Sequence, residues 1–274
     1  MKKSTRIQAA QETLAIFEAG RYTAPSGRVV EVRDAQAAAM AGTRLYLPSD
    51  FPDPLPLYAK RIGATVIEVT AETTLEAARR LAPSNPMALN FASAKNPGGG
   101  FLNGSQAQEE SLARSSGLYP CLLHGRPMYD YHRQLGTCLY SDHMIYSPDV
   151  PVIREDEGAL LDTPYTMSFL TSSAVNAGAL YRNEPHNISQ IQPTMAERLR
   201  KVLWLASEHG HNTLILGAWG CGVFRNDPAM IAGLFAEALG PGAPFDRCFA
   251  HVTYAVYDGS ENQEVIRAFQ TRLS

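Results

Sequence analysis

The amino-acid sequence predicts an α/β fold with a largely parallel sheet and helices on both of its faces. Short apolar segments typical of buried strands alternate with segments of helical periodicity through the second half of the chain. The spacing of these segments is that of strand–helix–strand units, whose strands pair in parallel. No linker-like change of composition and no internal repeat divides the 274 residues. We therefore expect one α/β domain.

The first part of the chain, residues 1–60, is expected to be an extension packed on a catalytic core of residues 61–274. Apolar residues at helical spacing, a short β-branched segment and a cluster of prolines distinguish its elements. The predicted elements are a helix over Ser4–Ala19 ended by Gly20, a strand over Arg28–Val32, a helix over Asp34–Met40 and a proline-rich connector over Ser49–Leu57.

The core contains the regular alternation. Two Thr-x-x-Glu patterns, Thr73 with Glu76 and Thr194 with Glu197, predict capping boxes that open helices. The segment from about Pro120 to Asp162 mixes short helices, strands and turns. The predicted strands are Ala64–Val69, Met87–Phe91, Tyr165–Leu170, Thr213–Leu216 and Cys248–Val256. The predicted helices run from Thr73 to Leu81, from near Gln106, from Thr194 to Gly210, over Pro228–Leu239 and over Glu261–Phe269.

Composition and charge exclude several classes of protein. Hydrophobic residues make up 45% of the chain, which excludes a disordered protein. The 24 basic and 27 acidic residues give a net charge of -3, which argues against a domain that grips the DNA backbone, although a small phosphate pocket needs only a few oriented amides. No secretory signal and no membrane-spanning segment is predicted, so a cytoplasmic protein is expected.

Several common chemistries are absent from the sequence. The four cysteines, at positions 121, 138, 221 and 248, form no Cys-x-x-Cys pair and are expected to be reduced thiols. No P-loop, Gly-x-Gly-x-x-Gly, His-Glu-x-x-His or Gly-x-Ser-x-Gly motif occurs. His209 and His211 are not accompanied by a recognisable third metal ligand in the sequence. We expect neither a metal nor a cofactor.

A glycine-rich loop follows the predicted strand Met87–Phe91. It contains Asn96 and the consecutive glycines Gly98, Gly99 and Gly100, and it leads into a helix near Gln106. Three adjacent glycines cost backbone entropy, so they indicate either a flexible surface turn or a close approach to a phosphate or sugar. In open α/β sheets ligands bind beyond the carboxyl ends of strands, which favours the second interpretation.

Glu109 and Glu110 lie in the first turn of that helix. Acidic residues are common there because they complement the helix dipole. A catalytic interpretation needs one protonated carboxyl for a leaving group, and burial or a charged neighbour raises a carboxyl pKa while the dipole lowers it. The sequence leaves open which effect is larger. Side chains of adjacent helical residues point about 100° apart, so the two carboxyls are expected to have different roles.

A second glycine-rich loop follows Thr213–Leu216. Asp227 is a predicted N-cap with Pro228 at the first helical position, and the preceding glycines let amides turn toward an anion. Phe224 is either a packed anchor or a platform for stacking a base. A third, weaker stretch of small polar residues, which contains Asn176, follows the strand ending at Leu170.

The string NPGGGFLNGSQAQEESL resembles the signature of poly(ADP-ribose) glycohydrolases, three glycines followed by Gln-Glu-Glu at residues 108–110. The residues LNFASA at 89–94 and GCGVF at 220–224 resemble the compact bacterial type. The resemblance covers most of the chain. It implies a macrodomain-like three-layer α/β sandwich with a mixed central sheet and an N-terminal helical extension.

The resemblance also implies an activity and site residues. The activity is metal-independent hydrolysis of the ribose–ribose O-glycosidic bonds of poly(ADP-ribose), which releases ADP-ribose. Glu110 would protonate the departing ribose oxygen and then activate water, and Glu109 would hold ribose hydroxyls. The implied substrate-binding residues are Asn96, Gly98, Gly99, Gly100, Gln108, Asn176, Gly222, Val223 and Phe224, with Phe224 stacked on adenine.

The implied partners are poly(ADP-ribose) and ADP-ribosylated proteins, with ADP-ribose as product. We expect a monomeric protein that has a role in the DNA damage response. We expect it to bind neither DNA directly nor a membrane. Two alternatives remain open: a macrodomain that binds ADP-ribose without catalysis, and a hydrolase that removes single ADP-ribose units. A macrodomain that only binds ADP-ribose needs loops that hold its phosphates but no proton donor, so the pair of glutamates favours an enzyme.

Overall fold

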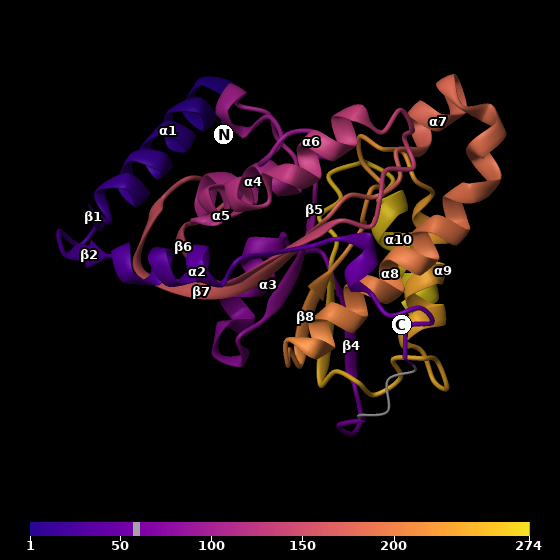
Figure 1. The fold of residues 1–274 in the computed structure, drawn as a ribbon. Helices are drawn as coiled ribbons and strands as arrows, with labels where there is room; N and C mark the ends of the chain where they lie inside the picture. The colour runs from indigo at the N-terminus through magenta and orange to yellow at the C-terminus, as the bar shows by residue number, and fades with distance from the viewer. Residues whose placement is uncertain (57–60, 274) are drawn as a thin grey trace.

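The computed structural model describes residues 1–56 and 61–273, and its centre is a seven-stranded mixed sheet (Figure 1). The end of the predicted connector at Leu57 and the predicted boundary at residue 60 lie outside the described residues. The strand order is β3 (Arg44–Tyr46), β6 (Met144–Arg154), β7 (Leu160–Ser172), β5 (Met87–Phe91), β8 (Thr213–Leu216), β9 (His251–Ala255) and β4 (Val66–Thr70). A separate two-stranded ribbon contains β1 (Arg21–Thr23) and β2 (Val29–Glu31).

The sheet is parallel on one side and antiparallel on the other. Strands β7, β5, β8, β9 and β4 run parallel, whereas β6 is antiparallel to both β3 and β7. The alternation of strands and helices predicted the parallel part, and the mixed sheet implied by the family resemblance is confirmed. The carboxyl ends of β5, β8 and β9 therefore lie along one edge of the sheet, where the two glycine-rich loops begin.

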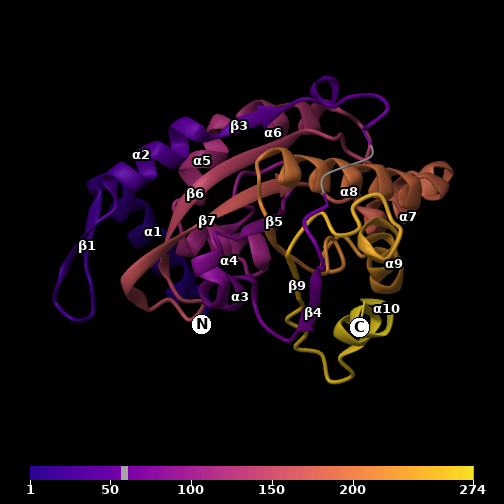
Figure 2. The same cartoon turned by 90° about the horizontal axis from the view of Figure 1, so that it is seen from below.

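Helices cover both faces of the sheet, which completes the three-layer sandwich (Figure 2). One face packs against helices of the C-terminal half and the other mainly against α2 to α6. The helices are α1 (Lys3–Ala19), α2 (Arg33–Gly42), α3 (Thr74–Leu81), α4 (Gln108–Ser115), α5 (Leu118–His124), α6 (Arg126–Gln134), α7 (Ala177–Asn183), α8 (Ile191–Glu208), α9 (Pro228–Leu239) and α10 (Glu264–Leu273). Short 3-10 turns cover Pro48–Asp50, Ala82–Ser84, Phe101–Asn103 and Pro185–Gln190.

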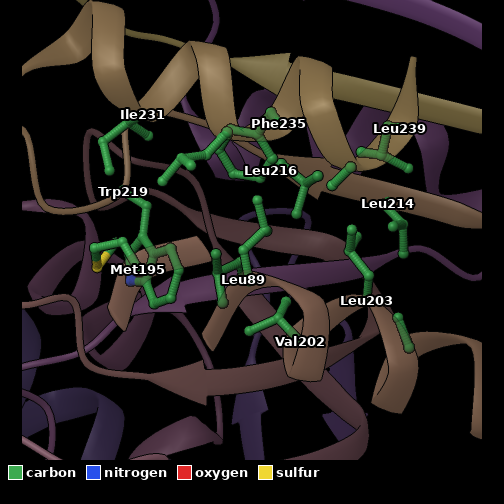
Figure 3. Packing of buried hydrophobic residues seen from close by; sticks show 14 of the residues in the cluster. Leu89, Met195, Val202, Leu203, Leu214, Leu216, Trp219, Ile231, Phe235 and Leu239 are labelled. Carbon is green, nitrogen blue, oxygen red and sulfur yellow. The ribbon is translucent and has the colours of Figure 1, made fainter. Parts of the chain in front are cut away.

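Alternation along the strands divides the core between these two faces. Leu89 of β5 and Leu214 of β8 pack with α8 and α9, whereas their neighbours Ala88 and Ile215 face the other helix layer. Figure 3 shows strand residues meeting Val202 and Phe235 of the two helices. Both strands are buried on both faces, which explains their continuous apolar sequences.

Several predicted elements differ from the observed ones at their ends. The capping box of Thr73 and Glu76 is confirmed, but the one of Thr194 and Glu197 is wrong, because α8 begins at Ile191 and places Thr194 inside the helix. Proline is tolerated in the first helical turn, where its missing N–H has no partner to lose, so Pro193 does not prevent the earlier start. Strand β7 begins before Tyr165, β9 begins after Cys248, and α10 runs over Glu264–Leu273.

Helix α1 is attached to the core through polar contacts of buried groups. The hydroxyl of Thr13 is fully buried, donates to the carbonyl of Arg114 at 2.6 Å and accepts from Nε of Arg154 at 2.8 Å. Arg6 Nε donates to the carbonyl of Gly104 at 2.7 Å. Helix α1 thus supports α4 and the loop that precedes it. Strand β3 from the same part of the chain joins the main sheet, and the division at residue 60 stays a prediction.

We predict that Thr13→Val lowers the free energy of unfolding by about 1–3 kcal/mol, because it leaves a buried carbonyl and a buried guanidinium N–H without this partner. Urea unfolding followed by circular dichroism measures the difference. Thr5→Val on the exposed face of the same helix is the matched control and should change the free energy by less than about 0.5 kcal/mol. Equal effects of the two substitutions would show that the buried contact contributes nothing.

Candidate active site

A large cavity opens at the carboxyl ends of β5, β8 and β9, where an α/β sheet is expected to bind ligands. Its volume is about 1260 Å³. Both glycine-rich loops and both glutamates predicted from the sequence line it. The walls include Phe91 to Ser93, Asn96, Gly99, Gly100, Gln106 to Leu112, Ala218 to Phe224 and Ala255 to Tyr257.

The glycines of the first loop allow the backbone to approach a carboxylate. Gly98 and Gly99 both have positive φ angles, of 67° and 59°. A Cβ atom at Gly99 would lie 2.3 Å from Oε1 of Glu110, and the amide of Gly100 donates to the same oxygen at 3.0 Å. The loop is therefore a close-approach turn rather than a flexible one, and the first group that it approaches is a protein carboxylate.

Glu109 is buried at the start of α4, with only 3% of its surface exposed. Its carboxylate accepts hydrogen bonds from the amide of Ser93 at 2.6 Å and from Nδ2 of Asn90 at 3.4 Å. Burial and, to a smaller extent, the charge of Glu110 raise the pKa of Glu109, these hydrogen bonds lower it, and the net result is a pKa of about 8. The protonated form of Glu109 is therefore favoured at neutral pH.

Glu110 has a different environment although it is the next residue. It is half-buried, lines the cavity and is fixed by the amide of Gly100. The adjacent side chains thus differ in burial, and their different roles stay a prediction. One carboxyl is held within the protein against the end of β5, and the other is presented to the cavity.

Gln108, predicted to bind substrate, joins α4 to β5. Its Oε1 accepts from the amide of Phe91 at 2.8 Å, and its Nε2 donates to the carbonyl of Leu89 at 2.8 Å and to Oγ1 of Thr74 at 3.1 Å. All of these partners are protein groups. Gln108 therefore positions the first turn of α4 relative to β5, and it also lines the cavity.

The second loop is shaped by two side chains at its end. Asp227 caps α9 by accepting from the amide of Ala229 at 2.8 Å, and Pro228 opens the helix, as predicted. Nδ2 of Asn226 donates to the carbonyls of Gly220 at 3.1 Å and Val175 at 2.8 Å. These bonds hold the loop against the strand-end region that follows β7.

The tip of the second loop faces the cavity with little cover. Val223 is 83% exposed, and a Cβ atom at Gly222 would meet nothing within 4 Å. Phe224 is half-buried and packs on the ring of Tyr140, with the centroids 6.0 Å apart. Phe224 is thus an anchored aromatic ring that also lines the cavity, so both interpretations of this residue remain compatible with its position.

Two predicted substrate-binding residues lie apart from the cavity walls. Asn176 is the N-cap of α7, and its Oδ1 accepts from the amide of Ala179 at 3.0 Å. Gly98 lies behind Gly99, and a Cβ atom there would meet the ring of Phe101 at 3.0 Å. The structure brings the other predicted residues, Asn96, Gly99, Gly100, Gln108, Glu109, Glu110, Gly222, Val223 and Phe224, together around one cavity.

The sequence reasoning missed three residues of the site. Asn90 touches Glu109, and a lone polar residue inside the apolar strand Met87–Phe91 was the available signal. Tyr257 lines the cavity and is 73% exposed just beyond β9, and no motif or periodicity in the sequence indicates it. Arg114 is buried and donates to the Ser105 carbonyl at 3.3 Å, which supports the loop before α4.

The side chains do not suggest a metal centre. Within residues 1–56 and 61–273, no group of three or more His, Cys, Asp and Glu side chains is placed to hold a metal ion. The four cysteines, two of them buried, are free thiols. Among the described helices none has the length and apolar character needed to cross a membrane.

The raised pKa of Glu109 predicts a pH-dependent stability. Between the ordinary value of 4.5 and about 8, the folded state holds a proton that the unfolded state lacks, so the free energy of unfolding falls as pH rises. Glu109→Gln removes this effect, and its stability relative to the unaltered protein should rise by about 1 kcal/mol per pH unit from pH 5 to 8. Chemical unfolding at several pH values measures it. The surface variant Glu237→Gln should follow the unaltered protein, and a Glu109→Gln curve parallel to both would contradict the assignment.

The chain is similar to known proteins along most of its length. Residues 10–155 match the family model described as microbial-type PARG, catalytic domain. The poly(ADP-ribose) glycohydrolase of Thermomonospora curvata is 49% identical, with a TM-score of 0.94 over 98% of this chain and 100% of that chain. A second structure of that protein, bound to the inhibitor ADP-HPD, has a TM-score of 0.92 with the same identity of 49% and the same coverage.

The poly(ADP-ribose) glycohydrolase of Deinococcus radiodurans in complex with ADP-ribose is 46% identical, with a TM-score of 0.81 over 86% of this chain and 96% of that chain. No curated protein matches the chain. The family match covers more than half of the sequence, and the structural matches extend over nearly all of it. The chain therefore belongs to the microbial-type poly(ADP-ribose) glycohydrolase family.

Proposed function

We propose that the protein hydrolyses the ribose–ribose O-glycosidic bonds of poly(ADP-ribose) and releases ADP-ribose. One observation carries the proposal: two adjacent glutamates lie in the first turn of α4, the buried Glu109 bound by the amide of Ser93 and the cavity-facing Glu110 bound by the amide of Gly100. Family membership supports it, as do the relatives crystallised with ADP-ribose and with ADP-HPD.

The retained ADP-ribose unit lies between the two glycine-rich loops. Its diphosphate rests against the open backbone of Gly222 and Val223, and its adenine stacks on Phe224, whose ring is already anchored by Tyr140. The terminal ribose meets the loop of Gly98 to Gly100, with Asn96 at its edge. Asn176 caps α7, and the amide of Gly178 in that helix donates to the carbonyl of Phe224 at 2.9 Å. Asn176 therefore acts on the adenine indirectly, by positioning α7 beside Phe224.

Glu110 serves as general acid and then as general base. As the bond between the anomeric carbon and the leaving ribose oxygen breaks, Glu110 gives its proton to that oxygen. It then takes a proton from the water that adds to the oxocarbenium-like carbon, so that the protein is restored.

Glu109 serves a different purpose. A protonated carboxyl both donates and accepts, so Glu109 bridges two ribose hydroxyls without adding a charge beside Glu110. Because the two residues are neighbours on one helical turn, they do not flank the scissile bond as the paired carboxyls of ordinary glycosidases do. One acid/base residue next to a neutral hydrogen-bonding partner fits this geometry, and the proposed reaction uses no metal ion.

A pure binding module and a hydrolase of single ADP-ribose units are the competing functions. A binding module needs the loops that hold the phosphates, but it does not need a proton donor such as the cavity-facing carboxyl of Glu110 beside the proposed ribose position. Unaltered poly(ADP-ribose) after prolonged incubation would favour the binding module. The cytoplasmic location, the monomeric state and a role in the DNA damage response stay predictions from the sequence.

We predict that Glu110→Gln keeps the fold and the affinity for ADP-ribose but lowers the rate of ADP-ribose release from polymer by about 100- to 10,000-fold, because general acid catalysis is lost. Calorimetry with ADP-ribose and chromatography of the released nucleotide measure the two properties. Glu237→Gln, an exposed glutamate of α9, is the control and should keep full activity. Near-normal turnover by Glu110→Gln would overturn the assignment of this residue.

We also predict that Gly99→Ala lowers the rate by about 100-fold, because its methyl group displaces the Glu110 carboxyl from its position. Gly136→Ala is a matched control, since Gly136 has a φ of 69° but a Cβ atom there meets nothing within 4 Å. Both variants carry similar backbone strain, and only Gly99→Ala disturbs the carboxyl. Equal activity of the two variants would mean that the close approach has no catalytic purpose.

A further inference from the structure

Two buried histidines lie behind the wall of the cavity. His132 belongs to α6 and is 1% exposed, and His143 directly precedes β6 and is 8% exposed. Neither side chain lines the cavity. A buried imidazole needs hydrogen-bond partners for its ring nitrogens, so these partners show what each ring holds in place. The proposed reaction assigns no role to either residue.

Both ring nitrogens of His132 have partners. Nδ1 lies 3.0 Å from the carbonyl oxygen of Ala94, and Nε2 lies 2.6 Å from Oγ of Ser141. A carbonyl oxygen only accepts, so Nδ1 carries the ring proton and donates to Ala94. Nε2 is then the acceptor, both for the hydroxyl of Ser141 and for its amide at 3.2 Å. Burial lowers the pKa of His132 to about 4, which agrees with a neutral ring in this tautomer.

Ser141 connects His132 to the second histidine. Its hydroxyl has one proton, which it donates to His132, so its oxygen accepts from Nδ1 of His143 at 2.7 Å. Burial lowers the pKa of His143 as well, which agrees with two neutral rings. The three side chains therefore form one buried chain of hydrogen bonds that ends at the carbonyl of Ala94, and such a satisfied buried network makes its surroundings rigid.

The bond to Ala94 fixes the segment that binds Glu109. Ala94 directly follows Ser93, whose amide donates to Oε2 of Glu109 at 2.6 Å. The amide of Asn96 donates to Oγ of Ser93 at 3.3 Å, so the carbonyl held by His132 lies inside this turn. The orientation of the turn, and with it the direction of the Ser93 amide, thus depends on His132. We call this contact of His132 the Ala94 arm.

The bonds to Ser141 fix the ring behind Phe224. Ser141 directly follows Tyr140, whose ring centroid lies 6.0 Å from that of Phe224 and 5.4 Å from that of His132. Tyr140 has a φ of 56°, a left-handed conformation that is strained for a bulky side chain. Such a conformation persists only where the surrounding structure holds it. The bonds from Ser141 to His132 hold it on one side, and we call them the Ser141 arm.

The buried guanidinium of Arg198 holds the same segment on the other side. Its Nη1 donates to the carbonyl of Leu139 at 3.1 Å, and its Nε donates to Oδ1 of Asp142 at 2.8 Å. Tyr140 therefore lies between neighbours that are both bonded to buried side chains. Contacts within the protein determine where its ring lies, so the contact surface of the second glycine-rich loop is ordered without a ligand.

We propose that His132 is a positioning residue, which orders the ribose end of the site through the Ala94 arm and the adenine end through the Ser141 arm. The inference rests on the proposed function, because the two ends are defined by the proposed place of ADP-ribose. One side chain then supports two parts of the ligand that it does not touch. Loss of either arm is expected to affect only the part of the ligand at its own end.

Three substitutions of His132 separate the two arms. His132→Asn keeps a donor close to the position of Nδ1 and loses the Ser141 arm, whereas His132→Gln places its amide close to the position of Nε2 and loses the Ala94 arm. His132→Phe keeps a ring and loses both arms. Calorimetry with ADP, which lacks the terminal ribose, reports the adenine end. The ratio of the dissociation constants of ADP and ADP-ribose reports the ribose end, and kcat for release of ADP-ribose from polymer reports the reaction.

We expect His132→Asn to weaken ADP binding by about fivefold or more, while the ratio and kcat stay within about twofold of the unaltered protein. We expect His132→Gln to keep ADP binding within about twofold and to lower both the ratio and kcat by about tenfold. His132→Phe should show both losses. A merely structural role would not separate these properties, because lower stability does not change the dissociation constants of the folded protein.

His211→Phe is the matched control, because His211 is also buried and bonded, to the hydroxyl of Tyr146 at 2.8 Å, but does not line the cavity. It should lower the thermal midpoint without changing kcat or either dissociation constant. Ser141→Ala is a milder variant that does not depend on how a substitution at His132 folds, and it should weaken ADP binding without changing the ratio.

The proposal is overturned if the three His132 variants bind ADP and ADP-ribose and cleave polymer as the unaltered protein does. It is also overturned if His132→Asn and His132→Gln lose the same properties to the same extent. If the unaltered protein binds ADP-ribose but releases none from polymer, the proposed function fails instead, and the two dissociation constants still test the two arms.

Discussion

The buried carboxyl of Glu109 is the interaction on which the rest of the site depends. It accepts hydrogen bonds from the amide of Ser93 and the side chain of Asn90 at the first turn of α4, and its pKa of about 8, raised chiefly by burial, favours the neutral form at pH 7. Gln108 adds three hydrogen bonds to β5 and α3 from the preceding position. Together these bonds fix the turn, from which Glu110 faces the cavity and accepts a hydrogen bond from the amide of Gly100.

The N-terminal helix extends this support outward. Arg114, one turn after the glutamates, is held through its carbonyl by Thr13, and its guanidinium reaches back to the loop before α4. Arg6 contacts Gly104 in the same loop. The first turn of α4 is thus held on one side by β5 and on another by α1. A substitution far from the cavity in α1 is expected to act on the site through this contact.

The sequence was sufficient where local pattern determines structure. Met87–Phe91, Thr213–Leu216 and Pro228–Leu239 were predicted at their observed bounds, because continuous apolar strands and an Asp-Pro helix start have few alternatives. It was insufficient where contacts distant in the chain decide. Gly99 is required because the carboxyl of Glu110, eleven residues later in the chain, lies where a side chain at position 99 would be. Thr194 does not cap α8, because the helix begins three residues earlier at Ile191. Asn176 caps its own helix α7 instead of lining the cavity. The protonation of Glu109 depends on burial, which no spacing reveals.

Cleavage of the bonds between ADP-ribose units distinguishes the proposed activity from its alternatives. The most direct measurement is mass spectrometry of products after incubation with poly(ADP-ribosyl)ated protein and, separately, with protein that carries single ADP-ribose units. We expect free ADP-ribose from the polymer and an intact modification on the singly modified protein. Release from the singly modified protein together with an unchanged polymer would contradict it.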